Sequence, residues 1–554
     1  MKTLKEVANL IFPEITTTID ELEAKYPARN LPEGAEVTRF APSPTGFLHT
    51  GSLFTSLIGQ KVASQSKGVF YIRLEDTDTK REVAGSGKEL IDQLKVFGVE
   101  PDEGYYGDHE KGAYGPYIQS QRADIYKVVI KYLLETGRAY PCFCTKEELG
   151  ALREEQEKNK VIPGYYGQFA KCRNLTPDEQ YERIIAGVPY VIRFKSMGNH
   201  EAKVAVHDLV RGDLELSQND QDIVIYKSDG LPTYHFAHLV DDHFMRTTIV
   251  TRGEEWLPSL PIHIELFETM GWEAPKYAHL PVIMKTENGV RRKLSKRKDK
   301  EAATSFFLQD GYPTYAFKQY LFTIANSNYE EWQIANPDLT IDDFTLTFEK
   351  MSLDGALFDI EKLRFFSKEY LGKMDGVTLK DFVKEWAKLY NEEVYNHIEL
   401  DEVYFAKIMN IEKDKPNPRK DYATCQEIFP KISFFFDEYY DEMMKAELPW
   451  NPNMPKDVII SVLQDFSDTL DFSKTEQDWF NGLKELGLRH NFAENNKIYK
   501  ANKDQYIGQV GDVAEMVRIS LSASKQSPNI FYVLNILGVN KVKDRIAKAI
   551  SLIK

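Results

Sequence analysis

The segment at residues 37–74 constrains the fold of this chain more than any other. Residues 37–40 predict a short strand, which runs into a turn rich in Pro and Gly. A helix is expected next, because apolar residues recur at helical spacing between residues 53 and 62. A second apolar strand is expected at residues 69–74. Strand, helix and strand with short connections form a βαβ unit, and its crossover implies a parallel sheet.

The turn after the first predicted strand carries groups that suit phosphate. It contains Pro42, Ser43, Pro44, Thr45, Gly46, Phe47, Leu48, His49, Thr50, Gly51 and Ser52. Open α/β folds bind ligands at the carboxyl edge of the sheet, and the free N–H groups at a helix start attract phosphate. Gly51 lets a phosphate approach the backbone, and His49 can stabilise the charge that moves onto pyrophosphate.

A second segment, far along the chain, carries two lysines in a basic, turn-prone stretch. It contains Lys293, Leu294, Ser295, Lys296 and Arg297, and it follows a strand expected at residues 279–284. Lysine ammonium groups on flexible stems suit a loop that closes over a triphosphate and opens to release pyrophosphate. Gly289 and Ser295 favour such mobility. Either segment alone could be a solvated turn, but together they predict adenylate-forming chemistry on ATP.

The composition indicates a multidomain globular protein. Its 554 residues are too many for one hydrophobic core, and no apolar run reaches the length of a membrane span. The N-terminus lacks the pattern of a signal or transit peptide, and four cysteines form no disulfide framework, so we expect a cytoplasmic location. The net charge of −15 does not exclude nucleic acid, because binding depends on local patches such as the basic residues at 285–300.

Several motifs, in this order along the chain, resemble those of the bacterial glutamyl-tRNA synthetases, which are class I aminoacyl-tRNA synthetases. Residues 39–51 resemble the first signature of that family, and residues 293–297 resemble its lysine-bearing second signature. The resemblance also covers residues 73–78, 227–235, 240–243 and 252–256. It is strong from about residue 36 to 300 and weaker beyond, where residues 365–367 depart from the Trp and Asn of the family.

The resemblance implies an α/β Rossmann-type catalytic domain with a parallel sheet, an inserted α+β module and an all-α C-terminal region that binds the anticodon. Amphipathic helix patterns dominate from about residue 300 onward and agree with that last region. The expected divisions are a helical extension at 1–35, the first catalytic half at 36–115, an acceptor-binding insertion at 116–220, the second catalytic half at 221–275, a stem-contact region with the lysine segment at 276–368 and the helical anticodon-binding domain at 369–554.

The resemblance also implies an ATP-dependent ligase that joins L-glutamate to the 3′ end of tRNA-Glu through a glutamyl-adenylate. The α-carboxylate of glutamate would attack the α-phosphorus of ATP, so no side chain acts as nucleophile. His49, Lys293 and Lys296 would be catalytic by stabilising charge together with Mg²⁺. The expected ATP-binding residues are His49, Gly51, Glu255, Trp256, Lys293 and Lys296. The family resemblance favours a monomer.

A pocket for glutamate needs cationic forks for two carboxylates and an anion for the ammonium. The positions that match the family pocket are Arg39, Ser43, Glu75, Tyr234 and Arg252. Either arginine can grip a carboxylate bidentately, and the family pattern favours Arg39 for the side-chain carboxylate. Glu75 is the expected partner of the ammonium, and Ser43 and Tyr234 offer hydroxyls beside the substrate.

The cysteines of the expected insertion leave two readings open. Cys142 and Cys144 would point to the same face of an extended segment, and Cys172 follows further along. Some members of the family bind zinc at this place, which implies a site formed by Cys142, Cys144, Tyr166 and Cys172. Tyr166 is farther from Cys172 than the tyrosine usually is, so free reduced thiols are the alternative. Cys425 stands alone and is expected in a core.

Other functions fit the residues less well. A glutaminyl-tRNA synthetase normally carries Glu and Asn where this chain has Ser43 and Thr45, and its anticodon region is rich in β structure. A small-molecule nucleotidyltransferase would have no role for the helical C-terminal half, and a non-catalytic RNA-binding protein would not need the ATP signatures. Charging of tRNA-Gln in addition to tRNA-Glu stays open, because it depends on a few anticodon contacts.

Overall fold

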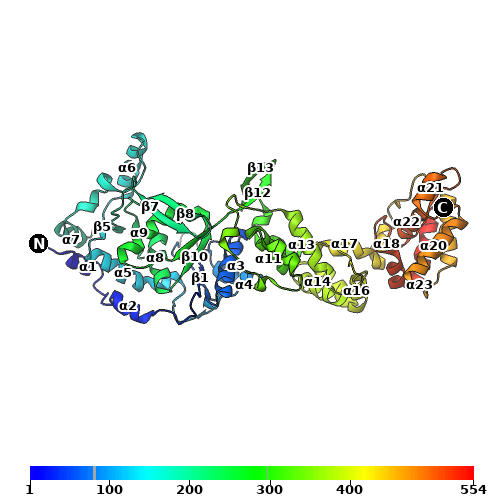
Figure 1. Ribbon diagram of the computed structural model, residues 1–554, viewed down its shortest axis with the longest axis horizontal. Coiled ribbons are helices and arrows are strands. Elements are labelled where there is room, and N and C mark those ends of the chain that lie inside the picture. Colours follow the sequence, from blue (N-terminus) through cyan, green and yellow to red (C-terminus); the bar gives the residue numbers. More distant parts are fainter. Residues whose placement is uncertain (79–82, 296, 554) are drawn as a thin grey trace. The chain divides into compact units, whose positions relative to one another are not determined.

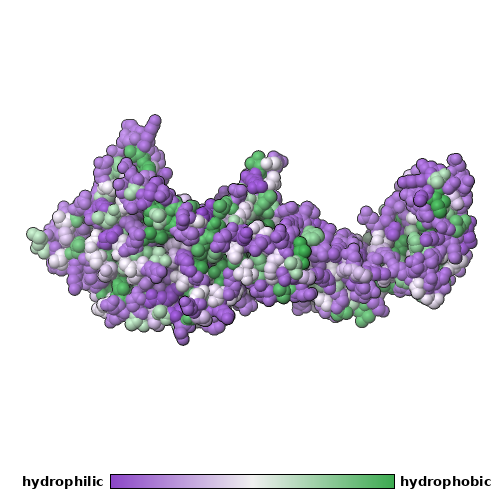
Figure 2. All heavy atoms as spheres, viewed as in Figure 1, coloured by the Kyte–Doolittle hydropathy of each residue, from purple (hydrophilic) through white to green (hydrophobic). Residues whose placement is uncertain are grey.

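The computed structural model describes residues 1–78, 83–295 and 297–553 (Figure 1). The described chain divides into two compact units. The first unit comprises Met1–Phe306 and Lys318–Asp359, and the second comprises Phe307–Phe317 and Ile360–Lys554. In Figure 2 the visible face of the first unit is mostly hydrophilic, and hydrophobic residues gather along its middle.

Within the described ranges, one large sheet of eight strands organises the first unit. From edge to edge it contains β4 (Glu110–Lys111), β3 (Glu103–Tyr105), β2 (Val69–Ile72), β1 (Val37–Phe40), β10 (Ile249–Gly253), β11 (Lys276–Leu280), β7 (Lys203–Asp208) and β8 (Gly212–Ser217). Neighbours from β3 to β7 are parallel, and β4 and β8 are antiparallel edges. The prediction of a parallel sheet is confirmed. The strand order reverses between β1 and β10, which creates a crevice at their carboxyl ends.

Helices cover both faces of this sheet, and the alternation of side chains along β1 decides what each face receives. Thr38 lies toward helix α3 (Thr50–Gln65), since its hydroxyl donates to the carbonyl of Gly59 at 2.7 Å. Val37 belongs instead to a core shared with α5 (Ala123–Glu135), α8 (Tyr234–Phe244) and α9 (Leu260–Met270). The strand period of two therefore places Arg39 on the α8 face.

The remaining helices of the first unit surround this sheet and its insertion. They are α1 (Leu4–Ile11), α2 (Ile19–Lys25), α4 (Ser86–Val96), α6 (Lys146–Lys158), α7 (Pro177–Ile185) and α12 (Tyr329–Ala335), while α10 (Thr304–Asp310) and α11 (Thr314–Ala325) include residues of both units. Helices α1 and α2 lie within the expected N-terminal extension, and their apolar residues enter the same core as α5, α8 and α9. The extension is therefore packed into the first unit.

The strands of the expected insertion are divided between two sheets. Strands β5 (Ala139–Cys142), β6 (Val191–Phe194) and β9 (Val224–Tyr226) pair antiparallel in a smaller sheet. Strand β9 was expected in the second catalytic half, whereas β7 and β8 were expected in the insertion and instead extend the large sheet beside β11. Pairing between strands that are distant in sequence decides which sheet each strand joins, and the local sequence pattern does not predict this pairing.

The lysine segment is preceded by a hairpin, not by an irregular loop. Strand β12 (Ile283–Glu287) pairs antiparallel with β13 (Val290–Lys293) and parallel with β14 (Ala356–Leu357). Asn288 and Gly289 have φ values of 51° and 79°, which is the conformation of a tight hairpin turn. Gly289 therefore closes a regular turn of a hairpin, which was not predicted from the sequence.

The second unit is almost entirely helical, as predicted. Its elements are α13 (Ile360–Gly372), α14 (Gly376–Tyr390), α15 (Glu392–Leu400), α16 (Glu402–Met409), α17 (Ile428–Ile432), α18 (Asp437–Met443), α19 (Lys456–Asp468), α20 (Glu476–Arg489), α21 (Asn496–Ala501), α22 (Val510–Ser522), α23 (Ile530–Ile553) and the short strands β15 (Phe492–Ala493) and β16 (Gly508–Gln509). Cys425 lies in its core, as expected. Among the described residues, no helix combines the length and apolar character that a membrane crossing requires.

Candidate active site

A cavity of about 1370 Å³ opens at the carboxyl ends of β1, β2 and β10. Its volume exceeds the roughly 300–1,000 Å³ of a pocket for one drug-sized ligand. All of the predicted ATP- and glutamate-binding residues that the structure describes line it: Arg39, Ser43, His49, Gly51, Glu75, Tyr234, Arg252, Glu255, Trp256 and Lys293. Lys296 lies outside the described residues. The fold thus brings together side chains from both ends of a long stretch of sequence.

His49 is fixed at the start of helix α3. It is the N-cap residue, and its Nδ1 accepts a hydrogen bond from the Gly51 amide at 3.0 Å. A β-carbon at position 51 would lie 3.2 Å from that same Nδ1, which is tighter than an ordinary contact. Glycine at this position therefore makes room for the imidazole, in addition to any access that it gives to phosphate. The helix start supplies further free N–H groups for an anion.

The two signature segments meet in the first unit. The Thr50 hydroxyl donates to the carbonyl of Glu301 at 2.7 Å, and the Thr304 hydroxyl donates to the carbonyl of Leu48 at 3.1 Å. A backbone bridge also joins His49 to Ala303. These contacts anchor the chain that follows the lysine segment against the start of α3, and Lys293 and His49 line the same cavity.

Lys293 ends β13 and lines the cavity together with Glu255. Its ammonium lies 3.2 Å from the Glu255 carboxylate, and both side chains are about half exposed, at 55% and 49%. The following turn is held by Asp299, which accepts from Arg292 at 2.6 and 2.8 Å and from the Ser295 amide at 2.8 Å. The Arg292 hydrogen bonds hold the pKa of Asp299 well below its usual range, so Asp299 stays ionised and paired with Arg292 at neutral pH.

A buried ion network lies beneath the cavity at Arg39. The Nε atom of Arg39 is 3.3 Å from both carboxylate oxygens of Asp242. Arg73 joins the same network, with Nη1 at 2.7 Å from Asp242 and Nη2 at 3.0 Å from Glu75. Although burial favours the neutral acid, Arg39 and Arg73 hold the pKa of Asp242 well below its ordinary value. Burial raises the pKa of Glu75, against the opposing effect of the two arginines.

Arg73, Asp241 and Asp242 were not assigned roles from the sequence. Asp241 is fully buried and accepts hydrogen bonds from Arg122, Tyr126 and Gln119 at 2.5, 2.8 and 3.0 Å. A signal was present, because two adjacent acids stand in an apolar helical run, and buried carboxylates require cationic or hydrogen-bonding partners. The sequence could not name those partners, which lie more than 100 residues earlier in the chain.

Arg252 differs from Arg39 in its surroundings. Within the described ranges it makes no ion pair, and it donates instead to neutral acceptors, among them Nε2 of His279 at 3.0 Å. Next to it the rings of Tyr234 and Trp256 lie 4.5 Å apart between centroids. Burial raises the pKa of Tyr234, so its hydroxyl stays protonated. The cavity therefore contains one arginine whose charge is largely neutralised and one whose charge is not.

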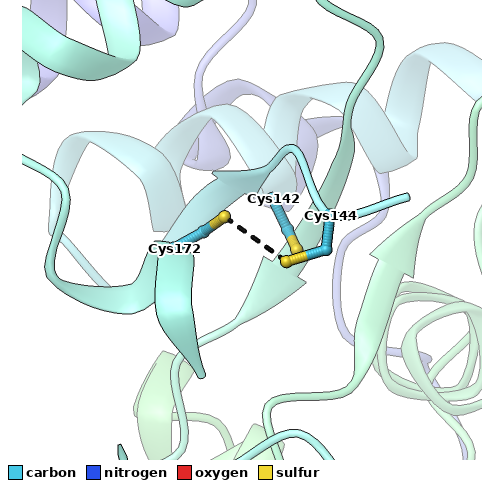
Figure 3. Close-up of side chains that lie close together, drawn as sticks. All are labelled: Cys142, Cys144 and Cys172. Carbon is cyan, nitrogen blue, oxygen red and sulfur yellow. Dashed lines mark hydrogen bonds between the residues drawn. The ribbon is translucent and has the colours of Figure 1, made fainter. Parts of the chain in front are cut away.

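The cysteine cluster is a separate site in the insertion. The sulfur atoms of Cys142, Cys144 and Cys172 all lie within 4.8 Å of one another, and Figure 3 shows the three side chains pointing together. The sulfurs of Cys144 and Cys172 are 3.8 Å apart. A tetrahedral zinc with Zn–S bonds of about 2.3 Å needs sulfurs about 3.8 Å apart, so the three thiols fit that metal.

Tyr165, and not the predicted Tyr166, lies against these sulfurs. The thiols of Cys142 and Cys144 are 3.4 and 3.3 Å from the Tyr165 hydroxyl, whereas the Tyr166 hydroxyl donates to the Ile162 carbonyl at 2.7 Å. The hydrogen bond from Cys172 lowers the pKa of Cys142, whereas burial raises the pKa of Cys144 and the hydrogen bond to Cys142 raises the pKa of Cys172. The chain turns between the two tyrosines, and sequence spacing alone could not tell which ring faces inward.

Comparisons with protein families agree with this arrangement. Residues 36–365 match the model described as the catalytic domain of class I tRNA synthetases (E and Q). Residues 383–550 match a model described as an anticodon binding domain. The first match covers the large sheet, the insertion and both signature segments, and the second covers most of the helical unit.

Whole-chain relatives extend the agreement. A glutamate–tRNA ligase of Clostridium perfringens (strain 13 / Type A) is 47% identical and matches over 98% of this chain and 100% of its own length. A glutamate–tRNA ligase of Sorangium cellulosum is 38% identical over 96% of this chain and 97% of its own. A crystal structure of a glutamate tRNA ligase from Elizabethkingia meningosepticum in complex with its amino acid superimposes with a TM-score of 0.74 at 31% identity, covering 94% of this chain and 100% of that one. The chain belongs to the glutamate–tRNA ligase family of class I tRNA synthetases.

Proposed function

We propose that this protein activates L-glutamate with ATP and transfers it to the 3′ end of tRNA-Glu. The observation that carries the proposal is one cavity at the reversal point of a parallel sheet, lined by Arg39, Arg252, Glu75 and His49. Two cations and one anion complement a dicarboxylic amino acid, and the helix start beside His49 complements a triphosphate. The full-length relatives named as glutamate–tRNA ligases support the same activity.

In this proposal the side chains position and stabilise, and none forms a covalent intermediate. Arg39 and Arg252 orient the carboxylates, and Glu75 holds the ammonium, so that the α-carboxylate can attack the α-phosphorus. His49, Lys293 and Lys296 stabilise the charge that develops on the departing pyrophosphate. Mg²⁺ when bound neutralises phosphate charge, and it enters largely with the nucleotide, since it keeps phosphate and water ligands. The terminal ribose hydroxyl of the tRNA then takes the glutamyl group from AMP.

The helical unit is the proposed anticodon reader. A cavity of about 790 Å³ there is lined by the half-buried Trp479, the exposed Phe480, Lys415 and Arg518. Aromatic faces stack on splayed bases, and cations contact phosphates or base edges. Binding of tRNA is expected to weaken steeply with salt, because each phosphate contact releases counterions.

We propose further that the insertion binds one zinc ion through Cys142, Cys144 and Cys172, next to Tyr165. The supporting geometry is the mutual approach of the three sulfurs. Metal analysis of freshly purified protein tests the proposal, since free thiols would give no stoichiometric zinc. The protein is proposed to act as a monomer in the cytoplasm, where its tRNA substrate is found, and sedimentation at working concentration tests the first point.

The test of the activity uses labelled glutamate with purified tRNA-Glu and tRNA-Gln, together with glutamate-dependent exchange between ATP and pyrophosphate. Exchange and charging of tRNA-Glu are expected, and charging of tRNA-Gln would mark a non-discriminating enzyme. Arg39→Lys should be badly impaired because it loses the planar fork, whereas Arg153→Lys changes an exposed arginine that pairs with Glu157 on the same helix and serves as control. Absence of exchange in the wild-type protein would refute the proposed function.

A further inference from the structure

Four histidines gather behind Arg252 in the interior of the first unit. They are His235 and His238 on α8, His263 on α9 and His279 on β11. His238, His263 and His279 are fully buried, and Arg252 is 5% exposed. Buried imidazoles in such number require explanation, because each ring has a donor and an acceptor to satisfy.

Two chains of hydrogen bonds, called arms here, start at Arg252, and the first runs through His279 to Asp208. The Nε–H of Arg252 donates to Nε2 of His279 at 3.0 Å, and Nδ1 of His279 lies 2.6 Å from Asp208. Asp208 is fully buried on β7, and it also accepts from the amides of Val210 and Arg211 at 3.0 Å. Because a carboxylate can only accept, it fixes the His279 proton on Nδ1 and leaves Nε2 as the acceptor for the arginine.

The second arm runs from Arg252 to His235. Nη1 of Arg252 lies 3.1 Å from Nδ1 of His263, and Nε2 of His263 lies 3.0 Å from Nδ1 of His235. An arginine cannot accept a hydrogen bond, so Nδ1 of His263 must be unprotonated and its proton sits on Nε2. Both arms therefore present neutral lone pairs to one guanidinium.

The groups around the arms preserve this neutrality. Burial lowers the pKa of His235 to about 4 and places that of His263 well below its ordinary value. Burial also lowers the pKa of His279, against the opposing effect of Asp208. His238 is occupied elsewhere, with Nδ1 at 2.9 Å from Asp242 and Nε2 at 3.0 Å from the Tyr277 hydroxyl. Two further cations lie near these rings: Arg39 is paired with Asp242, and Arg211, which adds to the lowering of the pKa of His279, is paired with Glu254.

We propose that Asp208, His279, His263 and His235 are positioning residues that hold Arg252 by uncharged acceptors and so reserve its charge for a substrate carboxylate. The inference rests on the proposed function, because it assumes that Arg252 meets glutamate. A carboxylate placed directly against Arg252 would fix the guanidinium equally well, but it would compete with the substrate for the positive charge. The hydrogen bonds to His279, His263 and the Trp256 carbonyl use three of the five N–H donors of the guanidinium, so donors remain for a substrate carboxylate.

Asp208→Asn tests the first arm by reversing its polarity without changing its volume. The amide oxygen can keep the bonds from Val210 and Arg211, so the NH₂ group faces Nδ1 and the backbone N–H of His279, which contact Oδ2 of Asp208 at 2.6 and 3.1 Å. The ring must then carry its proton on Nε2, which opposes the Nε–H of Arg252. We expect KM for glutamate to rise roughly 10- to 100-fold, as for loss of a hydrogen bond to a charged group, with KM for ATP changed less than about threefold.

Asp213→Asn is the matched control. Asp213 lies on the neighbouring strand β8 and also pairs with a histidine, His207, at 2.7 Å, but both side chains are exposed, at 95% and 65%. We expect its kinetic constants to equal those of the wild type. If Asp208→Asn does not fold, His279→Gln and His279→Leu decide the matter, because glutamine keeps an acceptor and a donor whereas leucine keeps neither.

The readouts separate the possible results. A rise in KM for glutamate alone supports the proposal, as does a KM for glutamate that is at least tenfold higher in His279→Leu than in His279→Gln. An unchanged KM for glutamate in folded Asp208→Asn, or equal rises for glutamate and ATP, would overturn it. Wild-type protein and Asp213→Asn that both lack glutamate-dependent exchange would overturn the proposed function itself.

Discussion

Replacement of Asp242 by asparagine should destabilise the first unit strongly. Asp242 has no exposed surface, and its carboxylate contacts Arg39 at 3.3 Å, Arg73 at 2.7 Å and His238 at 2.9 Å. Asparagine keeps the volume and some hydrogen bonds, but it removes the charge that balances two buried guanidinium groups. Removing one partner of a buried pair costs about 3–5 kcal/mol, so we expect the free energy of unfolding of this unit to fall by about that amount.

Urea unfolding followed by hydrogen exchange and mass spectrometry measures this effect in each unit separately. Peptides from β1, β2 and α8 should lose protection in Asp242→Asn, whereas peptides from the helical unit should not. Asp92→Asn is the control, since Asp92 pairs with Lys88 on an exposed helix surface, at 49% and 57% exposure, where such pairs contribute about 0.3–0.5 kcal/mol.

The dependence on pH gives an independent check. Arg39 and Arg73 depress the folded-state pKa of Asp242 below the value of about 3.9 in an unfolded chain. Its stabilising contribution is therefore complete above the unfolded pKa and is lost as the pH falls through the folded one. The difference between wild type and variant should stay constant from pH 6 to 8 and shrink only in strong acid. A difference below 1 kcal/mol at pH 7 would refute the argument from buried charge.

Three further predictions concern the sites themselves. Lys293→Ala should slow adenylate formation about 10- to 100-fold in single-turnover assays while melting within about 1 °C of the wild type, and Lys298→Ala, in the same exposed loop, should leave both unchanged. Burial raises the pKa of Glu75, and the carboxylate must be ionised to hold an ammonium. As the pH is lowered, KM for glutamate should therefore begin to rise at a higher pH than it would with an ordinary Glu. In Glu75→Gln, KM should be high at every pH. If zinc is present, Tyr165→Phe should lower the bound zinc measured by plasma mass spectrometry after dialysis, and Tyr166→Phe should not; equal losses would contradict the placement of Tyr165.

Local patterns carried much of the fold correctly. The apolar spacing after residue 53 predicted helix α3, and the flanking apolar runs predicted β1 and β2. These elements depend on neighbours within a few residues, so the sequence contains the relevant information. The motifs around His49 and Lys293 likewise indicated ATP chemistry, and all predicted cavity residues within the described ranges line one cavity.

Two features were not predicted correctly from the sequence: the hairpin before the lysine segment and the tyrosine beside the cysteines. Residues 288 and 289 form a tight turn within a hairpin, which the Asn-Gly pair signals but which was not predicted. Tyr165 replaced Tyr166 at the cysteines because the direction of each ring depends on the path of the chain around them. In both cases the spacing of residues along the chain did not show the local path of the backbone, and that path decided the outcome.

By itself, the sequence determined helix α3, strands β1 and β2, the helical character of the second unit, the order of the signature motifs and the class of ligand, because periodicity and motif chemistry are properties of short segments. Only the tertiary structure decided that β10 lies beside β1, that Asp242 balances Arg39 and Arg73, and that four histidines stand behind Arg252. The reason is physical: a buried charge or imidazole is satisfied by partners from distant parts of the chain. Those partners become neighbours only when the chain has folded.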